Sequence, residues 1–314
     1  MALSSPEARP KDGRTYIDPQ ALARLRGVSV RAERVVDGVL QGSHRSPHQG
    51  ISVEFAEHKE YAPGDDTRHI DWKVYGRMDR YVVKKFEQET NLQATFIIDG
   101  SGSMGYGAED MLTKFDYASV MTVSLAHVLL KQQDAVGLIK FAEGVAETVP
   151  ARARATQLGL LARTLETAAV AGTTGLNEAI EHVTAHQRRR GMIFLFSDFF
   201  TDLSATARVL RNLATRGQDV TLFSVFDGDE LTFPFKEMTL FEGMESKTRL
   251  LVEPTLMRRE YLKRFNAHRE SIKTLAADSM ANFCELDTRE APGEAILRFL
   301  REKRGRSANR GRGA

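Results

Sequence analysis

The sequence predicts an α/β protein with a doubly wound, mostly parallel sheet and an N-terminal β-rich segment. From residue 92 onward, short apolar runs such as "ATFIID" and "GMIFLFSD" alternate with amphipathic helical segments. Strands that are separated by helices favour parallel pairing, because a crossover helix lets the next strand run in the same direction. The 314 residues, 42% of them hydrophobic, suffice for one large domain with an appendage or for two domains.

The order of patterns divides the chain into an N-terminal arm or extension, a β-rich segment, the main α/β domain and a basic disordered tail. These four parts are expected at residues 1–40, 41–91, 92–303 and 304–314. Before the main domain, residues 28–39 show a short helical period. Ile51, Val53 and Phe55 alternate with polar residues, as expected for a half-buried strand. "YAPGDD" predicts a turn, and "RYVVKKFEQE" a further strand.

Within the main domain, each element is expected from its own periodicity. A helix is expected over 114–131, followed by the buried strand "AVGLIKF" and the short edge strand "GVAETVP". "QLGLLARTLETAA" and "LNEAIEHVTAHQRR" predict helices, and "GMIFLFSD" is the most apolar strand. After it come the helix "SATARVLRNLATRG", the strand "DVTLFSVFD" and the hairpin "EMTLFEGMESKTRLLVEP". A helix over 255–277, the strand "NFCELDT" and a helix ending near Lys303 complete the domain.

Composition excludes several classes of protein. The last fourteen residues hold six Lys or Arg and one Glu, so the remaining chain has 38 basic and 41 acidic residues and a net charge of −3. The body of the chain is therefore not expected to bind nucleic acid. The longest apolar stretch, Tyr117 to Leu130, is too short for a membrane span, and no signal peptide is visible. The single cysteine, Cys284, fits a reducing cytoplasm.

The loop "IIDGSGSMG" at 97–105 admits two interpretations. Its glycines satisfy G-x-G-x-x-G, the pattern of a dinucleotide-binding turn. That turn needs a helix directly after the third glycine and an acidic residue about 20 positions on. Here Gly105 is followed by the acidic stretch "YGAEDMLTK", and residues 117–133 contain no carboxylate. The phosphate interpretation therefore fails, and neither a P-loop nor a G-x-S-x-G nucleophile elbow occurs elsewhere.

The second interpretation is a metal site. Asp99, Ser101 and Ser103 supply a carboxylate and two hydroxyls at every second position, just after a predicted strand. Thr174 precedes a predicted helix, and Asp198 ends the most apolar strand. Ligands in open α/β sheets bind at the carboxyl ends of strands, and oxygen donors with few charges suit Mg²⁺ or Mn²⁺. We therefore predict a metal site made of these five residues.

Each part of this site also has a simpler interpretation. Thr173 or Thr174 can serve only as a helix cap, and Asp198 can cap the segment that follows it. A metal-dependent hydrolase would need a base near the site. Glu109, Asp110 and His127 are candidates by residue type, but no spacing connects them to the loop.

The five residues in this order resemble the metal-ion-dependent adhesion site of the von Willebrand factor A domain superfamily. The upstream block "EFAEHKEYAPGDDTRHIDWKVYGR" is similar to that of the bacterial family called domain of unknown function fifty-eight. The likeness covers about residues 40–304. It implies a von Willebrand factor A-like fold with the same five metal-site residues, although Gly172-Thr173-Thr174 stands where the family commonly has Gly-Gly-Thr. Either threonine can then be the ligand.

The resemblance also implies a function. Members of this family are often encoded beside MoxR-type AAA+ ATPases. We therefore expect no enzyme but a cytoplasmic, divalent-metal-dependent adaptor that binds a MoxR-type ATPase and a client protein in assembly or maturation. The client would contribute an Asp or Glu to the metal. A metal-dependent hydrolase that uses the same site, and a metal-free scaffold, remain the alternatives.

Overall fold

The computed structural model describes residues 19–44, 58–60, 75–76, 82–84, 92–168, 170–187 and 190–310. These residues fall into two compact units, one within Met1–Gly42 and Leu92–Ala314 and the other within Ser43–Asn91. In the second unit, β1 (His58–Glu60) and β2 (Val82–Lys84) pair antiparallel. The strand expected at 51–55 and the "PGDDTRHIDWK" block lie outside the described residues.

The larger unit contains a six-stranded sheet in the order β10-β7-β6-β3-β4-β5. All neighbours pair in parallel except β4 and β5, so the predicted doubly wound, mostly parallel sheet is confirmed. The bounds of the strands are β3 (Gln93–Asp99), β4 (Ala135–Phe141), β5 (Val145–Arg152), β6 (Gly191–Ser197), β7 (Asp219–Phe226) and β10 (Asn282–Asp287). The edge position of β5 matches its alternation of exposed and half-buried residues.

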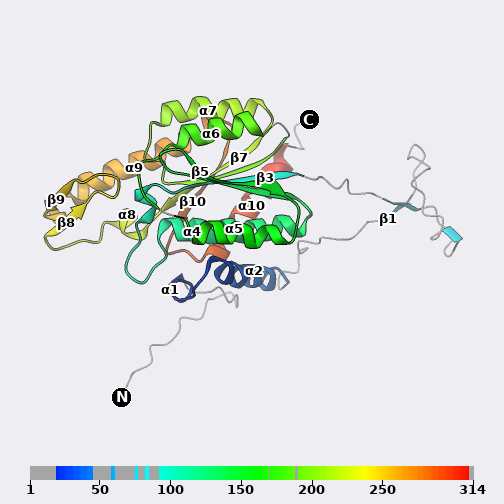
Figure 1. Ribbon diagram of the computed structural model, residues 1–314, viewed down its shortest axis with the longest axis horizontal. Helices are drawn as coiled ribbons and strands as arrows, with labels where there is room; N and C mark the ends of the chain where they lie inside the picture. The colour runs from blue at the N-terminus through cyan, green and yellow to red at the C-terminus, as the bar shows by residue number, and fades with distance from the viewer. Residues whose placement is uncertain are drawn as a thin grey trace, which may run out of the picture. The chain divides into compact units, whose positions relative to one another are not determined.

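Helices cover both faces of this sheet (Figure 1). One face packs against α4 (Lys114–Lys131), α5 (Thr156–Glu166) and α10 (Pro292–Arg310), and the other against α6 (Leu176–His186), α7 (Leu203–Thr215) and α9 (Pro254–Asp278). Successive residues of β3 alternate between the two cores, with Phe96 and Ile98 in the first and Ile97 in the second. This alternation leaves the polar ends of the strands as the place where functional side chains can gather.

The N-terminal segment differs from the expected arm. α1 (Pro19–Ala23) and α2 (Val28–His44) bury Leu22, Val35 and Val39 in the core that also contains Phe96. The main-chain N–H of Val28 also donates a hydrogen bond to the Glu166 carboxylate (2.6 Å). Residues 1–40 were predicted as an arm or extension, whereas the structure packs buried side chains of α1 and α2 into the main core.

The C-terminal end also differs from the prediction. α10 continues to Arg310, so the helix includes residues 304–310 of the segment that was predicted as a basic disordered tail. The basic composition of this segment is compatible with a helix, because Arg and Lys are good helix formers.

The remaining elements lie at the carboxyl end of the sheet or close to it. A short 3₁₀ helix, η2 (Gly102–Gly105), follows β3, and α8 (Gly228–Thr232) follows β7. The expected hairpin forms from β8 (Thr239–Glu242) and β9 (Arg249–Val252), which pair antiparallel. η2, α8 and this hairpin supply residues to the site described next.

Candidate functional site

The carboxylate of Asp99 lies at the centre of the candidate site. β3 pairs in parallel with β4 and β6, so Asp99 emerges from the middle of the sheet, where it is fully buried. Its Oδ1 accepts a hydrogen bond from the Ser101 amide (2.9 Å). Its Oδ2 accepts hydrogen bonds from the hydroxyls of Thr174 (3.0 Å) and Ser197 (2.6 Å). Three separate segments of the chain therefore meet at this one carboxylate.

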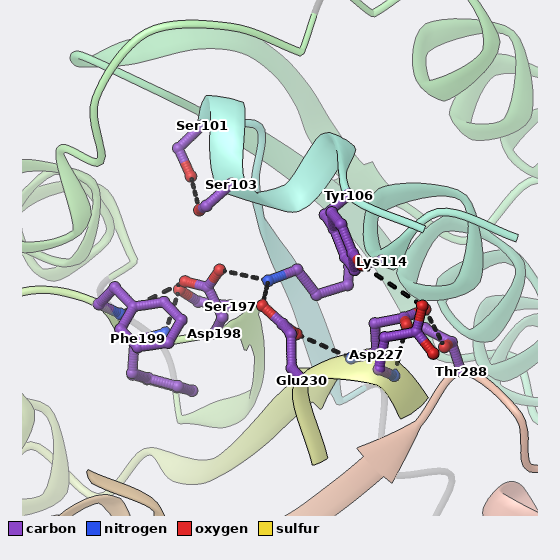
Figure 2. Close-up of polar contacts among 12 residues, drawn as sticks. Ser101, Ser103, Tyr106, Lys114, Ser197, Asp198, Phe199, Asp227, Glu230 and Thr288 are labelled. Carbon is purple, nitrogen blue, oxygen red and sulfur yellow. Dashed lines mark hydrogen bonds and ion pairs between the residues drawn. The ribbon is translucent and has the colours of Figure 1, made fainter. Parts of the chain in front are cut away.

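Ser101 and Ser103 bring two hydroxyls to the same loop. Their Oγ atoms lie 3.2 Å apart (Figure 2). Ser101 is fully buried, whereas Ser103 is half-buried and so reaches towards solvent. The spacing of two residues predicted from the sequence therefore does bring the two hydroxyls together.

Main-chain hydrogen bonds connect the loop that contains Gly172 to the loop that carries the two serines. The amide of Gly102 donates to the Gly172 carbonyl (2.9 Å), and the amide of Ala171 donates to the Gly100 carbonyl (3.0 Å). Gly172 has a φ of +84°, in the left-handed region that favours glycine. This turn places Thr174 beside Asp99 and leaves Thr173 exposed. Of the two threonines, Thr174 is thus the one that contacts Asp99.

Asp198 is buried next to a lysine rather than beside the two serines. Its Oδ2 accepts a hydrogen bond from Lys114 Nζ (2.8 Å), and its Oδ1 accepts one from the Phe200 amide (3.3 Å). The same ammonium contacts Glu230 Oε1 at 2.8 Å (Figure 2). Both Lys114 and Asp198 have side chains only 1% exposed. The fifth predicted residue therefore adjoins the site but already has a cationic partner.

Burial and charge explain the ionisation of these groups. Burial raises the pKa of Asp99 to about 6, and the nearby negative charge of Asp198 adds to the rise, against the hydrogen bond from Ser197. Burial disfavours the charged form of Lys114, but the carboxylates of Asp198 and Glu230 outweigh it and raise the pKa of Lys114 above its ordinary value. Negative charge at Asp99 is thus only partly compensated by the protein itself.

The arrangement of donors fits a small, hard dication. Asp99, Ser101, Ser103 and Thr174 offer one carboxylate and three hydroxyls around one point, with the charge of Asp198 close by. Mg²⁺ and Mn²⁺ prefer oxygen donors of this kind, and a bound dication would offset the negative charge that raises the pKa of Asp99.

No group of three or more His, Cys, Asp or Glu residues that could hold a metal occurs among the residues that the structure describes.

The pKa of Asp99 leads to a pH prediction for the protein without divalent ions. The folded state holds the Asp99 proton more tightly than the unfolded state, so this group stabilises the fold at low pH and the contribution is lost as the pH rises through about 6. Between pH 5 and pH 7, we expect the free energy of unfolding of the parent protein to fall by about 1 kcal/mol relative to that of the Asp99→Asn variant. Urea titrations with EDTA at both pH values measure this difference, and a rise over the same interval would refute it.

Sequence reasoning missed three residues that support this site: Lys114, Ser197 and Glu230. Ser197 directly precedes Asp198 in "FLFSD", so its place at the strand end was a signal that could have been used. Lys114 and Glu230 are 116 residues apart in the chain, and nothing local connects them.

The residues considered as a catalytic base lie in other surroundings. Glu109 and Asp110 are exposed, and His127 lies in α4, where burial lowers its pKa and where Glu33 and Asp37 of α2 are close enough to oppose that shift. Cys284 is buried in the core, and burial raises the pKa of its thiol to about 12. A cysteine with such a pKa has little thiolate at neutral pH.

None of the helices that the structure describes has the length and hydrophobicity needed to cross a membrane.

Comparison with known proteins gives a family match and several likenesses. A family model described as "Protein of unknown function DUF58" matches residues 57–271, more than half of the chain. The uncharacterized protein Rv1480 of Mycobacterium tuberculosis is 29% identical over 293 residues, which cover 91% of each chain. BatB from Bacteroides thetaiotaomicron is 15% identical, with a TM-score of 0.42, over 67% of this chain and 99% of its own. The SpRpn10 VWA domain is 10% identical, with a TM-score of 0.40, over 65% of this chain and 93% of its own.

Proposed function

This chain belongs to the DUF58 family of proteins of unknown function, and from that premise we propose that it is a divalent-metal-dependent protein-binding adaptor. The proposed metal is Mg²⁺ or Mn²⁺. The observation that carries the proposal is the meeting of the Ser101, Ser103 and Thr174 hydroxyls around the buried Asp99 carboxylate. These four side chains offer a dication three neutral hydroxyl donors and only one anionic donor.

The small number of anionic donors determines how much positive charge a bound cation would keep. Asp99, Ser101 and Ser103 would hold the cation directly, while Thr174 keeps Asp99 oriented or adds its own hydroxyl. A bound dication would retain positive charge there and attract a carboxylate from outside. Because Ser103 is half-buried and not fully enclosed, an Asp or Glu of another protein can approach from that side. Binding of this type needs no covalent step.

Asp198 has a distinct part in this proposal. Its two oxygens already accept hydrogen bonds from Lys114 and the Phe200 amide. We infer that it acts chiefly through its charge, or through a water molecule, and that Lys114 keeps it from adding a full second anion to the cation. The cation then remains electrophilic towards a partner carboxylate.

The partner proposed from the family resemblance is a MoxR-type AAA+ ATPase, together with a client that supplies the carboxylate. The hairpin formed by β8 and β9 offers a further contact region, since Leu240 is 51% exposed and its cross-strand neighbour Leu251 is 63% exposed. Exposed apolar side chains that lie together are typical of protein interaction surfaces. The proposed site of action is the cytoplasm.

Calorimetric titration with Mg²⁺ and Mn²⁺ tests the proposal. We expect the parent protein to bind, and the Ser101→Ala/Ser103→Ala variant to lose at least about tenfold in affinity, because two donor oxygens are removed. The matched control is Ser271→Ala/Thr274→Ala, which removes two exposed hydroxyls of α9 that donate only to main-chain carbonyls.

Circular dichroism of both variants verifies the fold. Equal affinity in the parent and the site variant would refute the metal site.

In a pull-down of the purified MoxR-type ATPase, the proposed adaptor should retain the ATPase with Mg²⁺ present and lose it with EDTA. Retention that is unchanged by EDTA would refute metal dependence.

A further inference from the structure

The turn between β8 and β9 lies directly on the loop that carries the two serines. The Met244 carbonyl is so close to Gly102 that a Cβ on this glycine would lie 2.3 Å from the oxygen. The terminal methyl of Met244 would lie 3.6 Å from a Cβ on Gly105. This close approach explains why glycine is needed at position 102, where the sequence pattern alone also allowed a phosphate-binding turn.

Glu245 is the residue of this turn that faces the loop. Its Oε1 accepts a hydrogen bond from the Ser103 amide (3.4 Å). Glu245 is half-buried, while residues 242–244 and 246–250 on both sides of it are exposed. Its side chain therefore lies against the serine loop, as does the terminal methyl of Met244, and Glu245 is the only one of residues 242–250 that is not exposed.

The charge of Glu245 lacks a cationic partner among the residues that the structure describes. The adjoining strand arginine, Arg249, instead pairs with Glu242 at 3.0 Å. Within the part of the chain that the structure describes, no lysine, arginine or histidine forms an ion pair with Glu245. A carboxylate that accepts a hydrogen bond from the amide of a proposed ligand residue, Ser103, and that lacks a cationic partner among the described residues is suited to a bound cation.

We propose that Glu245 is an intramolecular carboxylate ligand of the cation held by Asp99, Ser101 and Ser103, so that the hairpin caps the site. This inference rests on the proposed function and adds a residue to it. The carboxylate of Glu245 takes the position that a partner's Asp or Glu would otherwise fill. A partner carboxylate must then displace Glu245, and the exposed Leu240 and Leu251 move with the same hairpin.

Substitution of Glu245 by Gln tests this inference through metal binding alone. In Mn²⁺ titrations, Glu245→Gln should bind about tenfold more weakly than the parent, because an anionic donor is lost while the size of the side chain is kept. Glu242→Gln is the matched control. It removes the same charge from the same hairpin, but its carboxylate pairs with Arg249 away from the serine loop, so its affinity should stay within about twofold of the parent.

Hydrogen–deuterium exchange gives a second readout. Addition of Mg²⁺ should slow exchange of the amides at 243–248 in the parent and in Glu242→Gln, since a coordinated Glu245 ties the turn to the loop. The same addition should leave these amides unchanged in Glu245→Gln.

The possible results separate this inference from the function on which it rests. If Ser101→Ala/Ser103→Ala loses Mn²⁺ binding but Glu245→Gln binds like the parent and shows the same protection, the role of Glu245 is refuted and the metal site stands. If the serine variant binds as the parent does, or if neither binds, the metal site fails and this inference with it.

Discussion

Replacement of Lys114 by Met is expected to lower the free energy of unfolding by about 3–5 kcal/mol, the usual cost of removing one partner from a buried ion pair. The Lys114 ammonium contacts both Asp198 and Glu230 (Figure 2), at 2.8 Å in each case. The side chains of Lys114 and Asp198 are 1% exposed. Without the ammonium, the buried carboxylate of Asp198 and the half-buried carboxylate of Glu230 would lie close together with no cation between them. Urea denaturation at pH 7 with EDTA measures the loss.

Lys131→Met is the matched control for this prediction. Lys131 ends the same helix, α4, but is exposed, so the same substitution should change stability by less than about 0.5 kcal/mol. A triple variant that combines Lys114→Met with Asp198→Asn and Glu230→Gln should recover part of the loss, because no unpaired charge remains. Equal effects of the two single substitutions would show that the buried network contributes nothing.

Replacement of Asp99 by Asn is expected to weaken Mg²⁺ or Mn²⁺ binding by about 100-fold or more, since it removes the one carboxylate at the centre of the proposed site. The fold should survive, because the amide oxygen can still accept hydrogen bonds from Thr174 and Ser197. Calorimetric titration measures the affinity, and circular dichroism verifies the fold.

Asp134→Asn controls for the loss of a buried aspartate. Asp134 directly precedes β4 at the opposite end of the sheet, where its Oδ1 accepts a hydrogen bond from the Leu92 amide (3.2 Å). Only 5% of Asp134 is exposed, so the two substitutions are similar in burial and change in charge. Metal affinity like that of the parent in Asp99→Asn would contradict the site, as would an equal loss in Asp134→Asn.

The two predictions describe different ways of balancing charge at one edge of the sheet. Lys114 is a cation of the folded chain that pairs with Asp198 and Glu230 and offsets part of their negative charge. Asp99 has hydroxyl and amide donors but no such partner among the described residues. A cation from solution would therefore act mainly on Asp99, whose pKa is raised to about 6 by burial and by the charge of Asp198.

Local patterns in the sequence predict most helices and strands of the main domain and the spacing of the two serines in the loop after β3. Helix α4 begins and ends where its apolar period predicted, because Thr113 caps its first turn and the period is sustained over eighteen residues. β6 is almost continuously apolar because it is covered on both faces. Ser101 and Ser103 meet because they stand two positions apart in one loop. Each of these features depends on neighbours in the chain.

Contacts between residues far apart in the chain depend on the three-dimensional packing. Thr174 contacts Asp99 across 75 positions, Lys114 contacts Glu230 across 116, and Glu245 reaches the Ser103 amide across 142. No periodicity relates such residues, because strand order and the packing of loops set their distances. α1 and α2 were predicted as an arm for the same reason, since their short apolar pattern becomes meaningful only against the core that they cover. Local patterns thus determined which residues are available, and long-range packing determined which of them share a site.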